Sequence, residues 1–287
     1  MAGLILSLLT ALSESFKDVF SKKSIYNLDE YTVSWILHLF TGLFLLPLLY
    51  FHGIPEIGDK WLIALVPAAI LNVAATVLFM KAIRYSDLSI TVPMIAFTPL
   101  FMLLTSPLLV NEFPSSLGLV GVVIIVIGSY LLHSRGEGDA CLGPLCALAV
   151  ARGPRLMLLV SFIWSFTANI DKIGLQASSP IFWAVTLHLS VALLLIPLVL
   201  IFSRHHLPQL RKEAKNLVPI GVFMALTMAL QMTAIQIYLV AYVIAIKRLS
   251  TLLSVFWGYL IFREKNIRQR LLGALIMIIG VFLISLS

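Results

Sequence analysis

The chain has 287 residues, of which 60% are hydrophobic and only 11% are charged, and its mean hydropathy is +1.03. A water-soluble domain of this size would not tolerate so much apolar surface, so we expect lipid to be the solvent for most of the chain. The formal net charge is +7, but most basic residues fall in short polar connections rather than along one stripe, which argues against nucleic-acid binding.

Polar or turn-forming residues divide the sequence into ten apolar segments, each near the roughly 20 residues that a helix needs to cross a bilayer. The segments are 3–23, 31–52, 61–83, 88–110, 116–133, 156–176, 180–202, 217–238, 240–262 and 268–286. The first has no basic leader and contains Glu14, Lys17 and Asp18, so we expect a membrane helix there rather than a cleavable signal peptide. The sequence predicts an all-α membrane protein with ten transmembrane helices.

The two halves of the chain match each other. At an offset of 150, residues 13–50 share ten identities with residues 163–200, and these include Lys22 with Lys172 and His38 with His188. At an offset of 152, residues 108–134 share eight identities with residues 260–286. A duplication is the simplest explanation.

We therefore expect a first five-helix repeat at 1–134, a connecting loop at 135–154 and a second five-helix repeat at 155–287. Because each repeat has an odd number of spans, the second enters the membrane from the opposite side. The prediction is two inverted repeats, an arrangement on which alternating-access transport is often built.

The distribution of basic residues predicts the orientation. The connections after the even-numbered segments clearly offer only Lys60. Those after the fifth, seventh and ninth segments hold eleven basic residues: Arg135, Arg152, Arg155, Arg204, Arg211, Lys212, Lys215, Arg263, Lys265, Arg268 and Arg270. The positive-inside rule then places these connections in the cytoplasm and both termini outside, in a multi-pass protein of the cell membrane (inner or plasma).

Ionisable residues inside the spans are the candidates for binding a solute, because Arg, Lys or Asp at membrane depth costs at least about 2.5–3.5 kcal/mol. Together with one polar tyrosine they are Glu14, Lys17, Asp18, Lys22, His38, Lys172, His188, Tyr242, Lys247 and Arg248. A loop at Lys247 and Arg248 would leave too short a ninth span, so this pair is expected inside the membrane. The alternative roles are ion pairs between helices, lysines that extend to the headgroups, and hydrogen bonds that bridge helices.

The two repeat-related histidines, His38 and His188, lie at equivalent depths in the second and seventh segments. Inversion of the repeats predicts that they lie on opposite sides of a central cavity. A histidine there would bind solute or exchange a proton near neutral pH. A buried neutral histidine bonded to a backbone group is the alternative.

Sequence motifs of enzymes and metal sites are missing. Cys141 and Cys146 lie in a polar connection without the His or carboxylate cluster that would complete a metal site. No Asp-rich cluster, H-E-x-x-H or G-x-S-x-G occurs in the sequence. We expect no enzymatic activity, no metal and no cofactor. A membrane-embedded enzyme acting on lipid-linked substrates and a structural membrane protein remain as alternative classes.

Glycines recur every seven residues in the fifth and tenth segments, at Gly121, Gly128, Gly273 and Gly280. Small residues at this spacing allow helices to approach closely. The pattern predicts either a scaffold interface between these two helices or a homodimer contact.

The segments VNEFPSSLGLVGVVIIVIG and FREKNIRQRLLGALIMIIG, together with the charged first helix, resemble the EamA-type branch of the drug/metabolite transporter superfamily. The resemblance covers essentially the whole chain and implies a ten-helix solute exporter or exchanger. The segment AYVIAIKRLSTLLSVFWGYLIFREK is also similar to the Lys-Arg segment with which the sugar-phosphate/phosphate translocators grip the substrate phosphate. That family places a further Lys where this chain has Ile95.

We expect a secondary transporter in which helices one to four and six to nine surround a midplane cavity. Basic candidates outnumber acidic ones, which favours a small anionic or zwitterionic metabolite as the solute. A sugar-phosphate/phosphate-type exchanger is the alternative within the same superfamily.

Overall fold

The computed structural model describes residues 1–24, 29–86, 91–133, 151–205, 210–262 and 267–287, and the regular secondary structure of this part of the chain is entirely helical. The first half contains α1 (Ala2–Ser24), α2 (Glu30–His52), α3 (Lys60–Tyr85), the 3₁₀-helix η1 (Val92–Phe97), α5 (Thr98–Val110) and α6 (Ser116–His133). The second half contains α8 (Arg152–Gln176), α9 (Pro180–Phe202), α10 (Leu210–Ile237), α11 (Val240–Lys247), α12 (Leu249–Phe262) and α13 (Ile267–Ser285).

These elements form the ten predicted spans, because η1 with α5 makes the fourth and α11 with α12 makes the ninth. Helices α2, α3, α8, α9 and α10 are each long and apolar enough to cross a membrane on their own. The all-α membrane fold is therefore confirmed. The largest boundary difference is in α10, which begins at Leu210 rather than at residue 217, because a polar helical turn can continue beyond the apolar part of a span.

The fourth and ninth spans are both interrupted near their middle. Pro99 follows the 3₁₀ turns of η1 and has no N–H for an α-helical hydrogen bond, so the helix type changes there. Arg248 separates α11 from α12, and its N–H bonds the Ala245 carbonyl at 3.0 Å, a tighter turn than in an α-helix. At the offset of 152 residues between the repeats, Arg248 is equivalent to Ala96 of the fourth span. The interruption therefore occurs at equivalent places in both repeats.

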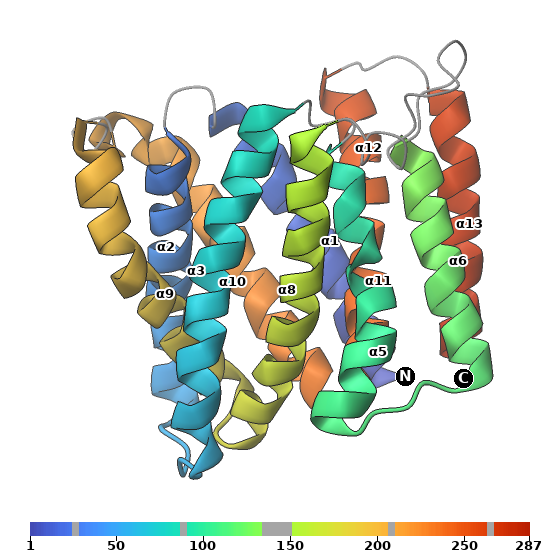
Figure 1. Ribbon diagram of the computed structural model, residues 1–287, viewed down its shortest axis with the longest axis horizontal. Coiled ribbons are helices and arrows are strands. Elements are labelled where there is room, and N and C mark those ends of the chain that lie inside the picture. Colours follow the sequence, from blue (N-terminus) through green and yellow to red (C-terminus); the bar gives the residue numbers. More distant parts are fainter. Residues whose placement is uncertain (25–28, 87–90, 134–150, 206–209, 263–266) are drawn as a thin grey trace.

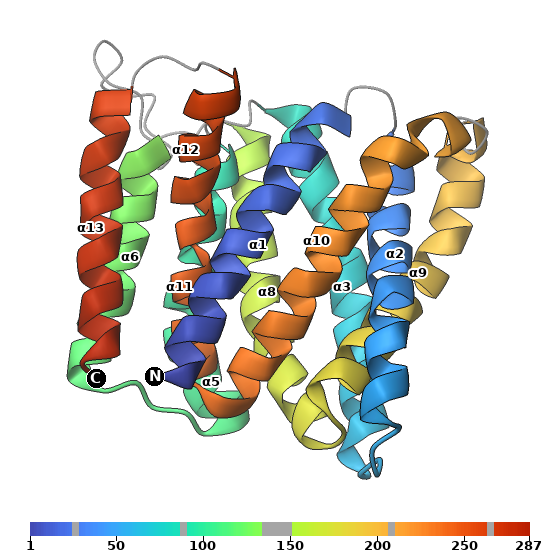
Figure 2. The same ribbon diagram turned by 180° about the vertical axis from the view of Figure 1, so that it is seen from behind.

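The contacts between helices have a twofold pattern that matches the duplication. Helices α2 and α9 pack together, as do α6 and α13, and each is a pair of repeat equivalents. The α1–α10 contact has its mate in α8–α3, and the α5–α8 contact has its mate in α12–α1. In Figures 1 and 2, α1 starts at the end of the bundle where both termini lie, whereas α8 starts at the opposite end. The repeats are therefore inverted.

Helices α6 and α13 pack against each other within the chain, and their glycines lie at this contact. A Cβ atom on Gly121 would lie 2.8 Å from the Gly280 carbonyl oxygen, and one on Gly128 would lie 2.7 Å from that of Gly273. The backbones thus approach more closely than larger residues permit. The predicted homodimer is a separate matter, since it would have to use the outer faces of α6 and α13.

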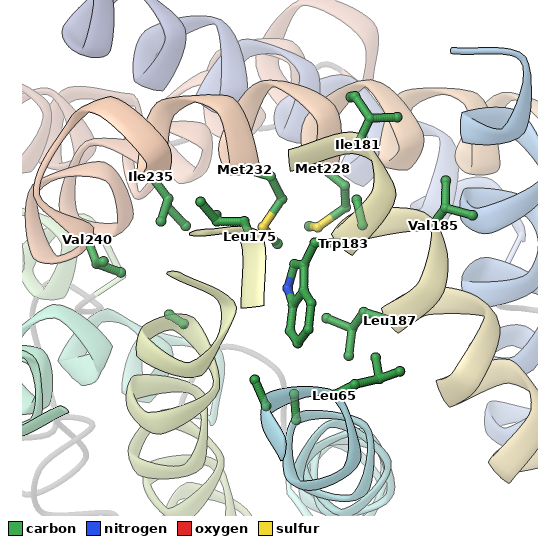
Figure 3. Packing of buried hydrophobic residues seen from close by; sticks show 14 of the residues in the cluster. Leu65, Leu175, Ile181, Trp183, Val185, Leu187, Met228, Met232, Ile235 and Val240 are labelled. Carbon is green, nitrogen blue, oxygen red and sulfur yellow. The ribbon is translucent and has the colours of Figure 1, made fainter. Parts of the chain in front are cut away.

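A large buried apolar cluster fills the termini end of the bundle. Its members on α9 and α10 include Ile181, Val185 and Ile235, which lie closer to that end than the middle of either helix. Figure 3 shows the fully buried Trp183 among Leu65, Leu187, Met228 and Met232. Helices of both repeats contribute to this cluster, so it joins the two repeats at the termini end of the bundle.

Candidate functional site

A cavity of about 250 Å³ lies in the middle of the bundle. Its lining comes from α1, α2, α3, α5, α8, α9, α10 and α11, together with Arg248 at the break before α12. No described residue of α6 or α13 lines it. The lining helices are the spans one to four and six to nine, the arrangement expected from the sequence.

The acidic side of the cavity belongs to α1. Lys17 Nζ lies 2.6 Å from Glu14 Oε1 and 3.2 Å from Asp18 Oδ1, so one lysine is shared by two carboxylates. The spacing of three residues puts Glu14 and Lys17 on one face of the helix, and the long lysine side chain also reaches the adjacent Asp18. Glu14 and Lys17 line the cavity, whereas Asp18 is not among the lining residues.

Opposite α1, Lys247 reaches into the cavity from the end of α11. Its Nζ donates to Gln231 Oε1 at 2.9 Å and lies 3.8 Å from Glu14 Oε2. The contact with Glu14 is an ion pair beyond hydrogen-bond distance, and it joins the first repeat to the second. The predicted intramembrane position of Lys247 brings it into contact with the predicted acid on the first helix.

Two charged groups of this site have unused hydrogen-bonding capacity. Arg248 Nε and Glu14 Oε2 are buried and have no hydrogen-bond partner in the described structure. Buried polar atoms are nearly always bonded, and exceptions call for an explanation. Since both residues line the cavity, a polar solute is a ready partner for these atoms.

His38 and His188 meet directly, with 2.8 Å between their Nδ1 atoms. Both line the cavity, and only 8% and 5% of their surfaces are exposed. The prediction that inversion places them on opposite sides of the cavity was wrong. Helices α2 and α9 pack against each other on the axis that relates the repeats, and equivalent residues near such an axis meet instead of separating.

Asp171 is an acidic lining residue that was not among the predicted binding residues. Its Oδ1 accepts a hydrogen bond from Trp183 Nε1 at 3.0 Å, which connects the cavity to the apolar cluster beside it. The sequence could have indicated Asp171, because a carboxylate inside a membrane segment is a functional candidate. Its role was ambiguous because the neighbouring Lys172 offered an ion-pair partner.

Lys172 and Tyr242, both predicted to bind solute, do not line the cavity. Lys172 forms a close ion pair with Glu112 and donates to the Tyr238 carbonyl at 3.2 Å. The step of about 100° between successive helical residues turns it away from the direction of Asp171. The Tyr242 hydroxyl accepts the Ser115 N–H at 3.1 Å in a second buried cluster. The side chain of Lys22 lies outside the described part of the structure.

The remaining lining is partly polar and partly made of thioethers. Met224, Met228 and Met232 follow each other at intervals of four residues, which places them on one face of α10. This spacing was visible in the sequence, although apolar residues at helical spacing usually indicate core packing. The uncharged polar residues of the lining are Ser34, Asn72, Thr76, Thr98, Thr167 and Gln231.

Comparison with known proteins adds the family to this geometry. The sequence model of the EamA-like transporter family matches residues 1–134 and 151–286. The chain belongs to the EamA-like transporter family. An uncharacterized transporter of Archaeoglobus fulgidus is 21% identical over 290 residues, which cover 100% of this chain and 99% of the relative. This membership and this relative identify a multi-pass membrane transporter and favour transport over enzymatic activity.

A solved structure has the same fold. One crystal structure of a protein aligns with a TM-score of 0.79 over 99% of this chain and 96% of its own, at 14% sequence identity. At this level of identity the likeness concerns the fold alone. The shared fold does not identify the solute, which has to be inferred from the residues that line the central cavity.

Proposed function

We propose that this EamA-like protein is a secondary transporter that moves a small anionic or zwitterionic metabolite by alternating access through the central cavity. One observation carries the proposal. Arg248 lines a membrane-embedded cavity beside Lys247, and its Nε is buried without a hydrogen-bond partner among the described residues. A guanidinium group binds carboxylates and phosphates through paired hydrogen bonds.

The charge balance of the cavity supports an anionic group on the solute. Lys17 is neutralised by two carboxylates of its own helix. Lys247 and Arg248 lie near the same two carboxylates, Glu14 and Asp18, so three cations share two acids on this side of the cavity. Glu14 Oε2 and Asp171 are available to an ammonium group, so a zwitterion fits the same lining.

The apolar packing at the termini end supports alternating access. The cluster around Trp183 combines helices of both repeats there and borders the cavity through Leu187, Met228 and Met232. Inverted repeats supply a mechanism for opening it, because each repeat can adopt the conformation of the other. The interruptions at Pro99 and Arg248 then act as bending points in the fourth and ninth spans.

A ligand screen followed by reconstitution tests the proposal. Purified protein is heated with amino acids, betaines, dicarboxylates, sugars and sugar phosphates, and a bound solute raises the melting temperature. A ligand at about 100 times its dissociation constant adds about 2.7 kcal/mol to the stability. The stabilising compound, in radiolabelled form, is then offered to proteoliposomes that contain the wild-type protein or variants.

We expect Lys247→Ala and Arg248→Ala to abolish uptake while the protein is still produced and folded. Lys60→Ala is the matched control, because Lys60 is exposed at the start of α3. Full transport by the double variant would overturn the binding role of the Lys-Arg pair. Ligand-induced stabilisation without uptake would instead indicate a binding protein that does not transport. Stabilisation by sugar phosphates alone would favour the phosphate-exchanger alternative.

A further inference from the structure

The bond between His38 and His188 links the two repeats inside the cavity. Helix α2 belongs to the first repeat and α9 to the second, and alternating access requires the repeats to move relative to each other. The same two helices are joined elsewhere by a hydrogen bond from the Ser203 hydroxyl to the Asp29 carboxylate. The imidazole pair differs from that contact because both of its partners have ring nitrogens that can bind a further proton.

The chemistry of two imidazoles limits the number of protons that the bonded pair can carry. A neutral imidazole has one N–H, so with 2.8 Å between the Nδ1 atoms one ring must donate and the other must accept. The donor ring then has a bare Nε2. A proton added there gives an imidazolium that still donates through Nδ1, and the bond becomes charge-assisted. A second proton would make both Nδ1 atoms donors and break the bond.

The structure offers a place for that single proton. His188 Nε2 is buried without a hydrogen-bond partner in the described structure, and His188 lines the cavity. If His188 is the donor in the pair, this nitrogen is the bare acceptor. A buried unpaired ring nitrogen is costly in a purely structural bond between helices. It is accounted for if the nitrogen binds a proton during the working cycle.

The surroundings of the pair determine which other groups can respond to pH. The titratable and charged lining groups that face it are Glu14 and Lys17 on α1, Asp171 on α8, Lys247 on α11, and Arg248. The lining residues of α3, α5 and α10 carry no titratable group. Lys17 is held by Glu14 and Asp18, and Lys247 by Gln231 and Glu14. The two imidazoles share the bond between their Nδ1 atoms, and the described residues offer no hydrogen-bond partner to His188 Nε2.

We propose that His38 and His188 together form a one-proton binding site that couples solute movement to the proton gradient. The inference deepens the proposed transport function and rests on it. The bond that stays intact with one proton and breaks with two lies at the contact between the repeats. A change of protonation therefore acts directly on the α2–α9 packing.

The test uses the proton itself and needs no solute. Protein in membranes adsorbed on a capacitive sensor is exposed to a jump from pH 8 to pH 6, and the charge displaced by proton binding within the membrane is recorded. Asparagine keeps a hydrogen-bonding atom near the place of Nδ1 and cannot take up a proton at these pH values. The main variant is His38→Asn/His188→Asn, and His52→Asn on the exposed end of α2 is its matched control.

We expect wild type and His52→Asn to give equal, saturable displacement currents. The double asparagine variant is expected to lose the current while its melting temperature stays within a few degrees of wild type. A current retained in the double variant would overturn the proton site, because the other lining groups would then carry it. The absence of a current in wild type would also overturn it, yet solute uptake by the same protein would leave the proposed transport function intact. Conversely, a wild-type current without uptake of any screened solute would count against the transport function alone.

Discussion

The Lys172 ammonium group and the Glu112 carboxylate form a largely buried ion pair between helix α8 and the connection from α5 to α6. The other Glu112 oxygen accepts the Val240 N–H at 2.8 Å, and Lys172 donates to the Tyr238 carbonyl at 3.2 Å. This junction satisfies backbone groups where α10 gives way to α11. It therefore fastens the first repeat to the second at the termini end of the bundle.

Removing the carboxylate of this junction should destabilise the protein strongly. In Glu112→Ala the Lys172 charge and the Val240 N–H both lose their partner, and breaking a buried pair from one side costs about 3–5 kcal/mol. We expect a clearly lower melting temperature in detergent. Glu56→Ala, at an exposed position between α2 and α3, is the control and should melt like wild type. An unchanged melting temperature for Glu112→Ala would contradict a stabilising role.

A double substitution separates the cost of the lone charge from the value of the pair. Glu112→Ala combined with Lys172→Met leaves no unpaired ammonium group, so part of the lost stability should return. Melting curves of the two single variants and the double variant supply the coupling between the residues. Additive losses would mean that the two side chains stabilise the fold independently.

The packing of α6 against α13 leads to a second prediction. Leucine in place of Gly128 would push its Cβ to within 2.7 Å of the Gly273 carbonyl oxygen and the Met277 side chain. Such overpacking typically costs about 1–3 kcal/mol because the backbones must separate. Thermal unfolding of Gly128→Leu should show the loss. Ile127→Leu, one residue away and 48% exposed, should leave the melting temperature unchanged. Equal melting of both variants would show that the close approach is dispensable.

The fold was predictable to a large extent because its signals are local and repeated. Apolar segments of bilayer length predicted the spans, and matched blocks at offsets of 150 and 152 predicted the duplication. The interruption at Arg248 was less accessible, since the sequence required a membrane position for Lys247 and Arg248 but did not indicate how the helix would bend around them.

The site was predictable in its components and less so in its contacts. Burial cost alone identified Glu14, Lys247 and Arg248, which the structure brings to one cavity. It did not distinguish Asp171 from Lys172, because neighbours on a helix differ in direction and only the packing decides which faces the cavity. The meeting of His38 and His188 depends on how close α2 and α9 come to the twofold axis. Depth in a segment carries no information on that distance.

The hydrogen bond from Trp183 to Asp171 leads to a third prediction. Trp183→Phe keeps an aromatic ring in the apolar cluster but removes the N–H that lies 3.0 Å from Asp171 Oδ1. Bonds to charged groups contribute about 1.5–3 kcal/mol, so the melting temperature should fall. Trp61→Phe is the matched control, because Trp61 Nε1 is buried without a hydrogen-bond partner in the described structure. If both variants melt alike, the indole N–H of Trp183 does not stabilise the carboxylate.

The orientation of the EamA-like bundle leads to the last prediction. The termini lie at one end, and the ends of α6 and α9 that precede the basic connections lie at the other (Figures 1 and 2). With the basic connections in the cytoplasm, an epitope tag after Ser287 should bind antibody on intact cells. Cys141 and Cys146, the two cysteines of the chain, lie between α6 and α8 and should react with a membrane-impermeant maleimide only after the cells are permeabilised. A tag that needs permeabilisation, together with cysteines that react on intact cells, would show the reverse orientation. Access to both from the same side would contradict the odd number of spans, five, between the cysteines and the C-terminus.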